Sequence, residues 1–199
     1  DDTVGKLCQQ ASEEARISRP TSAEYSHLTV EPIVQPANFN APHQVVIAGS
    51  ADGIAHALRL IKESADFKGG KAVPLAVSAP FHCRLMAPAR AHMADLFSQG
   101  GTATQPRELA FPYLPNRTGR ISRESSLILE LLIEQIDHPV LWRQTVEHLH
   151  AAGFKKAVEF GPGKVLQNLA KRIPGEDETT ILAVGVSDVA TLKAFEALQ

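Results

Sequence analysis

The stretch K-A-V-P-L-A-V-S-A-P-F-H, residues 71–82, joins two parts of the chain that are organised differently. Residues 71–78 predict a strand, and Ala79-Pro80 begins a loop that leads to His82. Catalytic groups of α/β folds gather at the carboxyl ends of strands, which is where this histidine lies. The position of His82 therefore suggests chemistry before any other part of the sequence is considered.

The residues before this strand predict a small layered unit. Apolar residues at helical spacing predict a helix over 3–15, and a second helix over 51–65 begins after Ser50, a residue suited to cap it. Strands are predicted over 29–36 and 43–48, with a turn signal at 38–42 between them. With the strand over 71–78, this order is typical of a ferredoxin-like unit that lacks its first strand.

The residues after His82 alternate between helical and strand patterns. Such alternation predicts a mostly parallel sheet covered by helices. Helices are expected over 84–98, 123–135, 139–152, 164–173 and 188–198, and strands over 155–160 and 179–184, with short strand and turn signals over 109–122.

The composition is that of a globular α/β protein, with 44% apolar residues, 21% charged residues and a net charge of −2. Lysine and arginine are scattered, which argues against a nucleic-acid partner, and no apolar run is long enough for a membrane span. Two cysteines and no zinc-site spacing favour a reduced, cytoplasmic setting without a bound metal.

Three local patterns carry a resemblance to a known family. They are Q-V-V-I-A-G-S (44–50), V-S-A-P-F-H-C-R-L-M-A-P-A (77–89) and V-E-F-G-P-G-K-V-L-Q-N-L (158–169). Together with Asn38-Phe39-Asn40, Asn116 and residues 134–142, in this order, they resemble bacterial malonyl-CoA:acyl-carrier-protein transacylases. The polar stretch at 16–28, read as a surface loop, departs from the family by its length.

The resemblance implies a two-part architecture and an acyl-transfer function. Residues 1–78 would be the incomplete ferredoxin-like subdomain, and residues 79–199 the C-terminal part of an α/β-hydrolase-like acyltransferase body. The activity implied is transfer of a malonyl group from malonyl-CoA, the substrate, to the phosphopantetheine thiol of acyl carrier protein in fatty acid biosynthesis. No cofactor is implied, and the sequence leaves a polyketide pathway open.

His82 and Gln135 are the expected catalytic residues. A serine hydroxyl needs a neighbouring imidazole to take its proton, and the resemblance assigns that role to His82. It makes Gln135, 53 positions later, the group that holds the ring, through its main-chain carbonyl. From the residues alone, the favoured interpretations are a loop histidine bonded to backbone for His82 and a solvent-exposed helix end for Gln135.

Three further residues are candidates for substrate binding. Phe81 resembles the aromatic residue that selects malonyl over bulkier acyl groups in related domains, and is otherwise a hydrophobic anchor. Asn38 and Asn40 resemble residues that line the subdomain side of the cleft, although turn chemistry explains them equally well.

Two other features invite a functional interpretation that their surroundings weaken. Gly161-Pro162-Gly163-Lys164 lacks the spacing of a phosphate-binding loop and is better read as a tight turn. Cys83 adjoins His82, but neighbouring residues of an extended chain point to opposite sides, so a Cys-His pair is not expected.

The 199 residues contain no G-x-S-x-G nucleophile elbow. The family's Gly-Gln-Gly segment and its carboxylate-binding arginine are not found either, which suggests a sequence that begins partway through a domain. The first interpretation is an acyltransferase whose serine lies outside this chain. The alternative is a non-catalytic remnant that binds carrier protein, and an unrelated hydrolase would need an elbow of its own.

Overall fold

The computed structural model describes residues 2–18, 31–101 and 106–196 of the 199-residue chain. These residues form a mixed α/β structure with seven α-helices and two separate two-stranded sheets. Within this part of the chain, no helix is long and apolar enough to cross a membrane.

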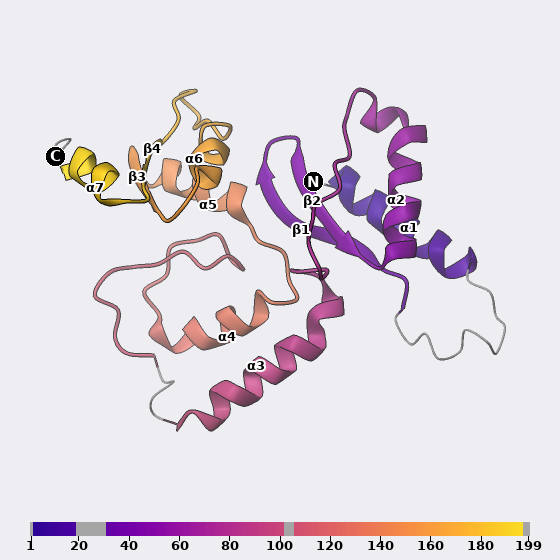
Figure 1. The fold of residues 1–199 in the computed structure, drawn as a ribbon, viewed down its shortest axis with the longest axis horizontal. Helices are drawn as coiled ribbons and strands as arrows, with labels where there is room; N and C mark the ends of the chain where they lie inside the picture. Colours follow the sequence, from indigo (N-terminus) through magenta and orange to yellow (C-terminus); the bar gives the residue numbers. More distant parts are fainter. Residues whose placement is uncertain (1, 19–30, 102–105, 197–199) are drawn as a thin grey trace.

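The N-terminal elements pack around a β-hairpin. Helices α1 (Asp2–Ser18) and α2 (Ala51–Glu63) lie side by side against strands β1 (Val34–Ala41) and β2 (Gln44–Gly49), which pair antiparallel (Figure 1). The core between them consists of Leu7, Cys8, Ala11, Val34, Ala57 and Leu60. Ser50 caps α2 as predicted, because its hydroxyl accepts the Gly53 N–H at 3.2 Å.

The hairpin corrects the predicted turn. The chain reverses at Pro42-His43, whereas residues 38–41, predicted as part of the turn, belong to β1. Proline fixes the first turn position and His43 takes a positive φ of 64° at the second, as a type II turn requires. The predicted strand over 29–36 is also shifted, since β1 begins at Val34; residues 29–30, and 19–28 of the predicted surface loop, lie outside the described residues.

The strand predicted over residues 71–78 does not form. In the described part of the chain these residues pair with no strand, and they run as an exposed trace from the region after α2 towards α3 (Figure 1). Val73, Leu75 and Val77 are 72%, 57% and 62% exposed. A strand needs a partner for its backbone groups, and nothing among the described residues supplies one.

The remaining elements follow the predicted order with shorter helices. The helices are α3 (Ala87–Gln99), α4 (Ile128–Glu134), α5 (Trp142–Ala151), α6 (Val165–Ala170) and α7 (Val189–Glu196). Strands β3 (Lys156–Phe160) and β4 (Leu182–Val186) pair parallel, the second starting three residues later than predicted. A second core of Ala41, Val146, Ile173 and Ile181 joins these elements to β1.

Val140 links the hairpin to the segment that follows α4. It accepts the Phe39 N–H and donates its own N–H to Ala37, each at 2.9 Å. This parallel bridge to β1 fixes the stretch after Gln135 against the N-terminal unit. The region where the two halves of the chain meet therefore contains both the predicted Gln135 and the predicted Asn38.

Candidate functional site

His82 occupies a strained backbone position at the end of the 71–82 stretch. Its φ is +60°, in the left-handed region that non-glycine residues seldom adopt. Its main-chain N–H donates to the Ile136 carbonyl at 3.2 Å. Strain of this kind persists only where surrounding contacts fix it, and such residues are concentrated at functional sites.

The structure brings the His82 ring against Gln135, as predicted. The ring Nδ1 lies 2.7 Å from the main-chain oxygen of Gln135. A carbonyl only accepts hydrogen bonds, so the Nδ1 must carry the proton of the neutral ring. The other nitrogen, Nε2, then has a lone pair with which to accept a proton.

The end of α4 explains why the Gln135 and Ile136 carbonyls are free to accept bonds from His82. The last carbonyl groups of a helix have no partner within the helix. Gln135 and Ile136 continue α4 as a tight turn, in which their N–H groups bond back to Leu131 and Ile133. His82 satisfies the two free carbonyls with its main-chain and ring N–H groups, and the ring thereby meets the negative end of the helix dipole.

The side chain of Gln135 has a separate partner that the sequence did not identify as a site residue. Its Oε1 accepts from the Asn116 amide at 2.7 Å, and the Asn116 carbonyl accepts the Leu141 N–H at 2.9 Å. Asn116 therefore braces the residue that holds His82. The only signal for Asn116 in the sequence was its place in the family resemblance.

The three predicted substrate residues lie in different settings. Phe81 is 49% exposed beside His82, so its ring is open to solvent in this structure. Asn38 and Asn40 lie on β1, and Asn38 forms the bridge with Val140. The structure thus places Asn38 near the 135–140 segment through its backbone, and both asparagines are partly buried.

Cys83 is unsuited to act as a nucleophile. Its side chain is completely buried, and desolvation raises the pKa of its thiol above the ordinary value. The thiolate is the reactive form, so burial keeps Cys83 inert at neutral pH. Cys8, also buried, has its pKa raised to about 12 by burial and by the proximity of Cys83.

Backbone amide groups at the start of α6, the helix that follows the turn at 161–164, already have a partner. The Glu159 carboxylate accepts the N–H groups of Leu166 and Gln167, each at 3.1 Å. Desolvation opposes ionisation of Glu159, but these two backbone donors and the Gln167 side chain together outweigh it and lower the pKa of Glu159. Because a carboxylate of the chain takes the amides that a phosphate would need, the tight-turn interpretation accounts for this motif.

Replacement of Glu159 by alanine is expected to destabilise the chain by about 1 kcal/mol, the usual contribution of a capping side chain. The effect should be complete above the ordinary glutamate pKa of 4.5 and should fade as the pH falls through the lower folded-state pKa. Urea unfolding at pH 7 and pH 3 measures both. The exposed Glu176→Ala is the matched control; an equal loss in both variants would contradict the assignment.

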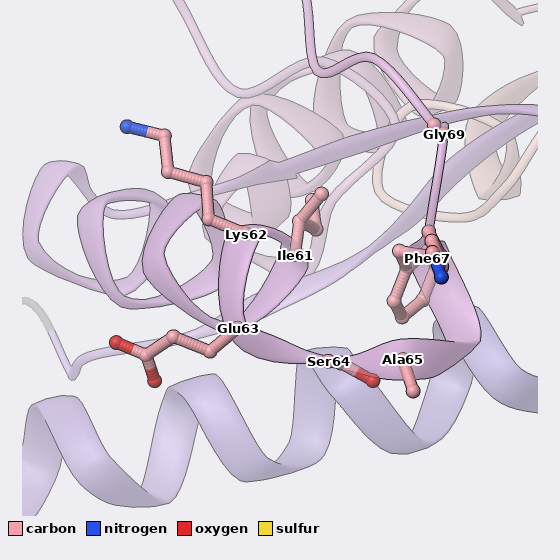
Figure 2. Close-up of a pocket in the computed structure, with 9 residues that line it drawn as sticks. Ile61, Lys62, Glu63, Ser64, Ala65, Phe67 and Gly69 are labelled. Atoms are coloured by element: carbon pink, nitrogen blue, oxygen red, sulfur yellow. The ribbon is translucent and has the colours of Figure 1, made fainter.

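A hollow of about 390 Å³ at the C-terminal end of α2 contains none of the predicted site residues. Figure 2 shows Ile61 and Phe67 at its wall, while the charged ends of Lys62 and Glu63 extend away from Phe67. The described residues also contain no group of three or more histidine, cysteine or acidic side chains placed to hold a metal ion.

Comparison with known proteins bears out the resemblance. No family model matches the chain. A Haemophilus influenzae protein named malonyl CoA-acyl carrier protein transacylase is 35% identical over 206 residues, covering 96% of this chain and 61% of the relative. The chain belongs to the malonyl-CoA:acyl-carrier-protein transacylase family. A Bacillus subtilis relative of the same name is 35% identical over 81% of this chain and 47% of its own length.

Solved structures agree with this assignment to the transacylase family. An acyl carrier protein S-malonyltransferase from Vibrio cholerae matches with a TM-score of 0.78 and 34% identity, over 98% of this chain and 55% of its own. A malonyl-transacylase in complex with its type II PKS acyl-carrier protein matches with a TM-score of 0.79 and 30% identity, over 100% and 55%. The chain therefore spans about half the length of the transacylases it matches.

Proposed function

We propose that this chain supplies the acid/base half of a malonyl transacylase, with His82 as the residue that moves the proton. The observation that supports this most strongly is the 2.7 Å contact between the His82 Nδ1 and the Gln135 carbonyl. This contact keeps the ring proton on Nδ1 and leaves the basic Nε2 on the opposite side of the ring. The Gln135 carbonyl thus takes the place that an aspartate has in a Ser-His-Asp triad.

In the proposed reaction a serine from outside these 199 residues attacks the thioester carbonyl of malonyl-CoA. Nε2 of His82 accepts the serine proton as the new ester bond forms, and then protonates the departing coenzyme A thiolate. The phosphopantetheine thiol of acyl carrier protein then gives its proton to Nε2 and attacks the malonyl ester. As the bond to the serine breaks, Nε2 returns that proton to the serine oxygen, which restores the free serine and the neutral ring. The Gln135 carbonyl and the α4 terminus favour the positive charge that the ring carries between these steps.

The proposal extends to the architecture and the substrate residues. Residues 1–78 would form the incomplete ferredoxin-like subdomain and 79–199 part of an α/β-hydrolase-like body, with the acyl groups bound where they meet. Phe81 beside the base, and Asn38 and Asn40 on β1, would line that site. We propose malonyl-CoA as the substrate, acyl carrier protein as the partner, a cytoplasmic setting and a role in fatty acid biosynthesis, all supported by the family relationship; a polyketide pathway stays an alternative.

Labelling with radioactive malonyl-CoA tests the proposal directly. The 199-residue chain alone should remain unlabelled, because it contains no nucleophile elbow and its buried Cys83 is unreactive. A fusion of the chain to the portion of the Haemophilus influenzae relative that the match leaves uncovered should be labelled, and should pass the label to an acyl carrier protein thiol. Stoichiometric labelling of the chain alone, or a folded fusion without transfer, would overturn the proposal.

A further inference from the structure

A charged pair holds the two sides of the His82–Gln135 contact together. Asp137, two residues after Gln135, has a side chain that is 7% exposed, and its carboxylate lies 3.4 Å from Arg90 Nη1 on α3. α3 begins at Ala87, five residues after His82. The pair therefore joins the helix that follows His82 to the turn whose carbonyls His82 binds.

Asp137 is itself fixed on a second side. The His138 Nδ1 lies 2.7 Å from one carboxylate oxygen of Asp137 and 2.9 Å from the main-chain oxygen of Glu134, so its N–H donates to both acceptors. A nearly buried carboxylate keeps its charge only when such partners replace water. The Asp137 carboxylate is thus held by Arg90 from α3 and by its own neighbour His138.

The His82 contact depends on this arrangement because both of its acceptors are main-chain atoms. No side-chain substitution removes the Gln135 or Ile136 carbonyl, so the contact is lost only if the turn moves. The strained φ of His82 favours such movement once the surrounding contacts weaken. In water, a histidine ring released from Nδ1 prefers to carry its proton on Nε2, which is the wrong nitrogen for the base.

We propose that Asp137, paired with Arg90, is a positioning residue that keeps His82 in the Nδ1–H form. This inference rests on the proposed function of His82 as the base. Both residues act through the α4 turn, which their pairing fixes against α3. A weakened pair leaves the fold in place but lets the proton of the ring move to Nε2.

The test is ¹⁵N NMR of the chain labelled at its histidines, recorded in the cold and at alkaline pH. His82→Gln identifies the His82 signals, whose shifts report which nitrogen is protonated. Asp137→Asn is expected to lower the ratio of the Nδ1–H form to the Nε2–H form about tenfold, as expected for a lost charged hydrogen bond. Arg90→Met should act in the same direction, and the double variant should be no worse than Asp137→Asn.

Glu31→Gln is the matched control, since it breaks an exposed pair with Arg84, two residues from His82, at 3.2 Å. It should leave the ratio unchanged. An unchanged ratio in Asp137→Asn or Arg90→Met, with the near-ultraviolet signal of Trp142 intact, would overturn the proposal. This readout needs no acyl transfer, so an inactive fusion defeats the proposed function alone. In an active fusion, Asp137→Asn should lower kcat and leave KM unchanged.

Discussion

Replacement of His82 by alanine in the fusion should lower malonyl transfer about a million-fold, because the serine then has no base. The expected loss is large because the nucleophile and its base act as a unit in covalent acyl transfer. Single-turnover kinetics of malonyl transfer from malonyl-CoA to acyl carrier protein measure this loss of rate. KM should change little, since the Nε2 of His82 acts on the proton and not on the parts of malonyl-CoA that hold it in the site.

Gln135→Ala provides the matched comparison. Its main-chain carbonyl survives the substitution, and only the side-chain bond to Asn116 is lost. Transfer should therefore fall less than about tenfold, the cost of one exposed neutral hydrogen bond. Equal losses in the two variants would show that the side chain of Gln135, and not its carbonyl, holds the ring.

The second large effect concerns stability. Val73, Leu75 and Val77 lie exposed on a stretch that pairs with no strand among the described residues. Complete burial stabilises each such residue by roughly 1.5–3 kcal/mol. The isolated chain should therefore melt below about 60 °C and aggregate on warming. The separate portion of the relative that the match leaves uncovered should raise the melting temperature when it is added in trans.

Replacement of Val73, Leu75 and Val77 by lysine should reduce both the aggregation of the chain and its stabilisation by the added portion. The chain should become more soluble, and its association with the added portion should weaken roughly a thousandfold, equivalent to about 4 kcal/mol. Ile17→Lys, at an apolar position on α1 that is 74% exposed, should do neither. A sharp, reversible transition of the unaltered monomer above about 60 °C would contradict this account of the 71–77 stretch.

The helices were predictable because their signals are local. The apolar stripe of α1 and the cap at Ser50 each depend on residues within one or two turns. The strands were less predictable, because a strand forms only when another strand pairs with its backbone groups. Residues 38–41 carry turn-forming asparagines, yet pairing with β2 draws them into β1. The apolar residues 71–78, by contrast, pair with no strand of the part of the chain that the structure describes.

The residues of the candidate site also differ in how far the sequence could predict them. The sequence pointed to His82 by its place after a strand pattern, although that strand does not form among the described residues. Its contact with Gln135 was predicted from the family resemblance alone, since no local rule relates residues 53 positions apart. Arg90 gave no signal in the sequence, and Asp137 gave only its place in the family resemblance. An arginine within one helix and an aspartate just after the next helix are otherwise ordinary surface residues. Only the packing of α3 against the α4 turn reveals that they meet.

The most direct measurement of the central claim is a crystal structure of the active fusion. It should place the Nε2 of His82 within about 3 Å of the serine oxygen, the reach of a proton transfer, while Nδ1 stays on the Gln135 carbonyl. A ring turned so that Nδ1 faces the serine, or a serine out of reach of His82, would contradict the account.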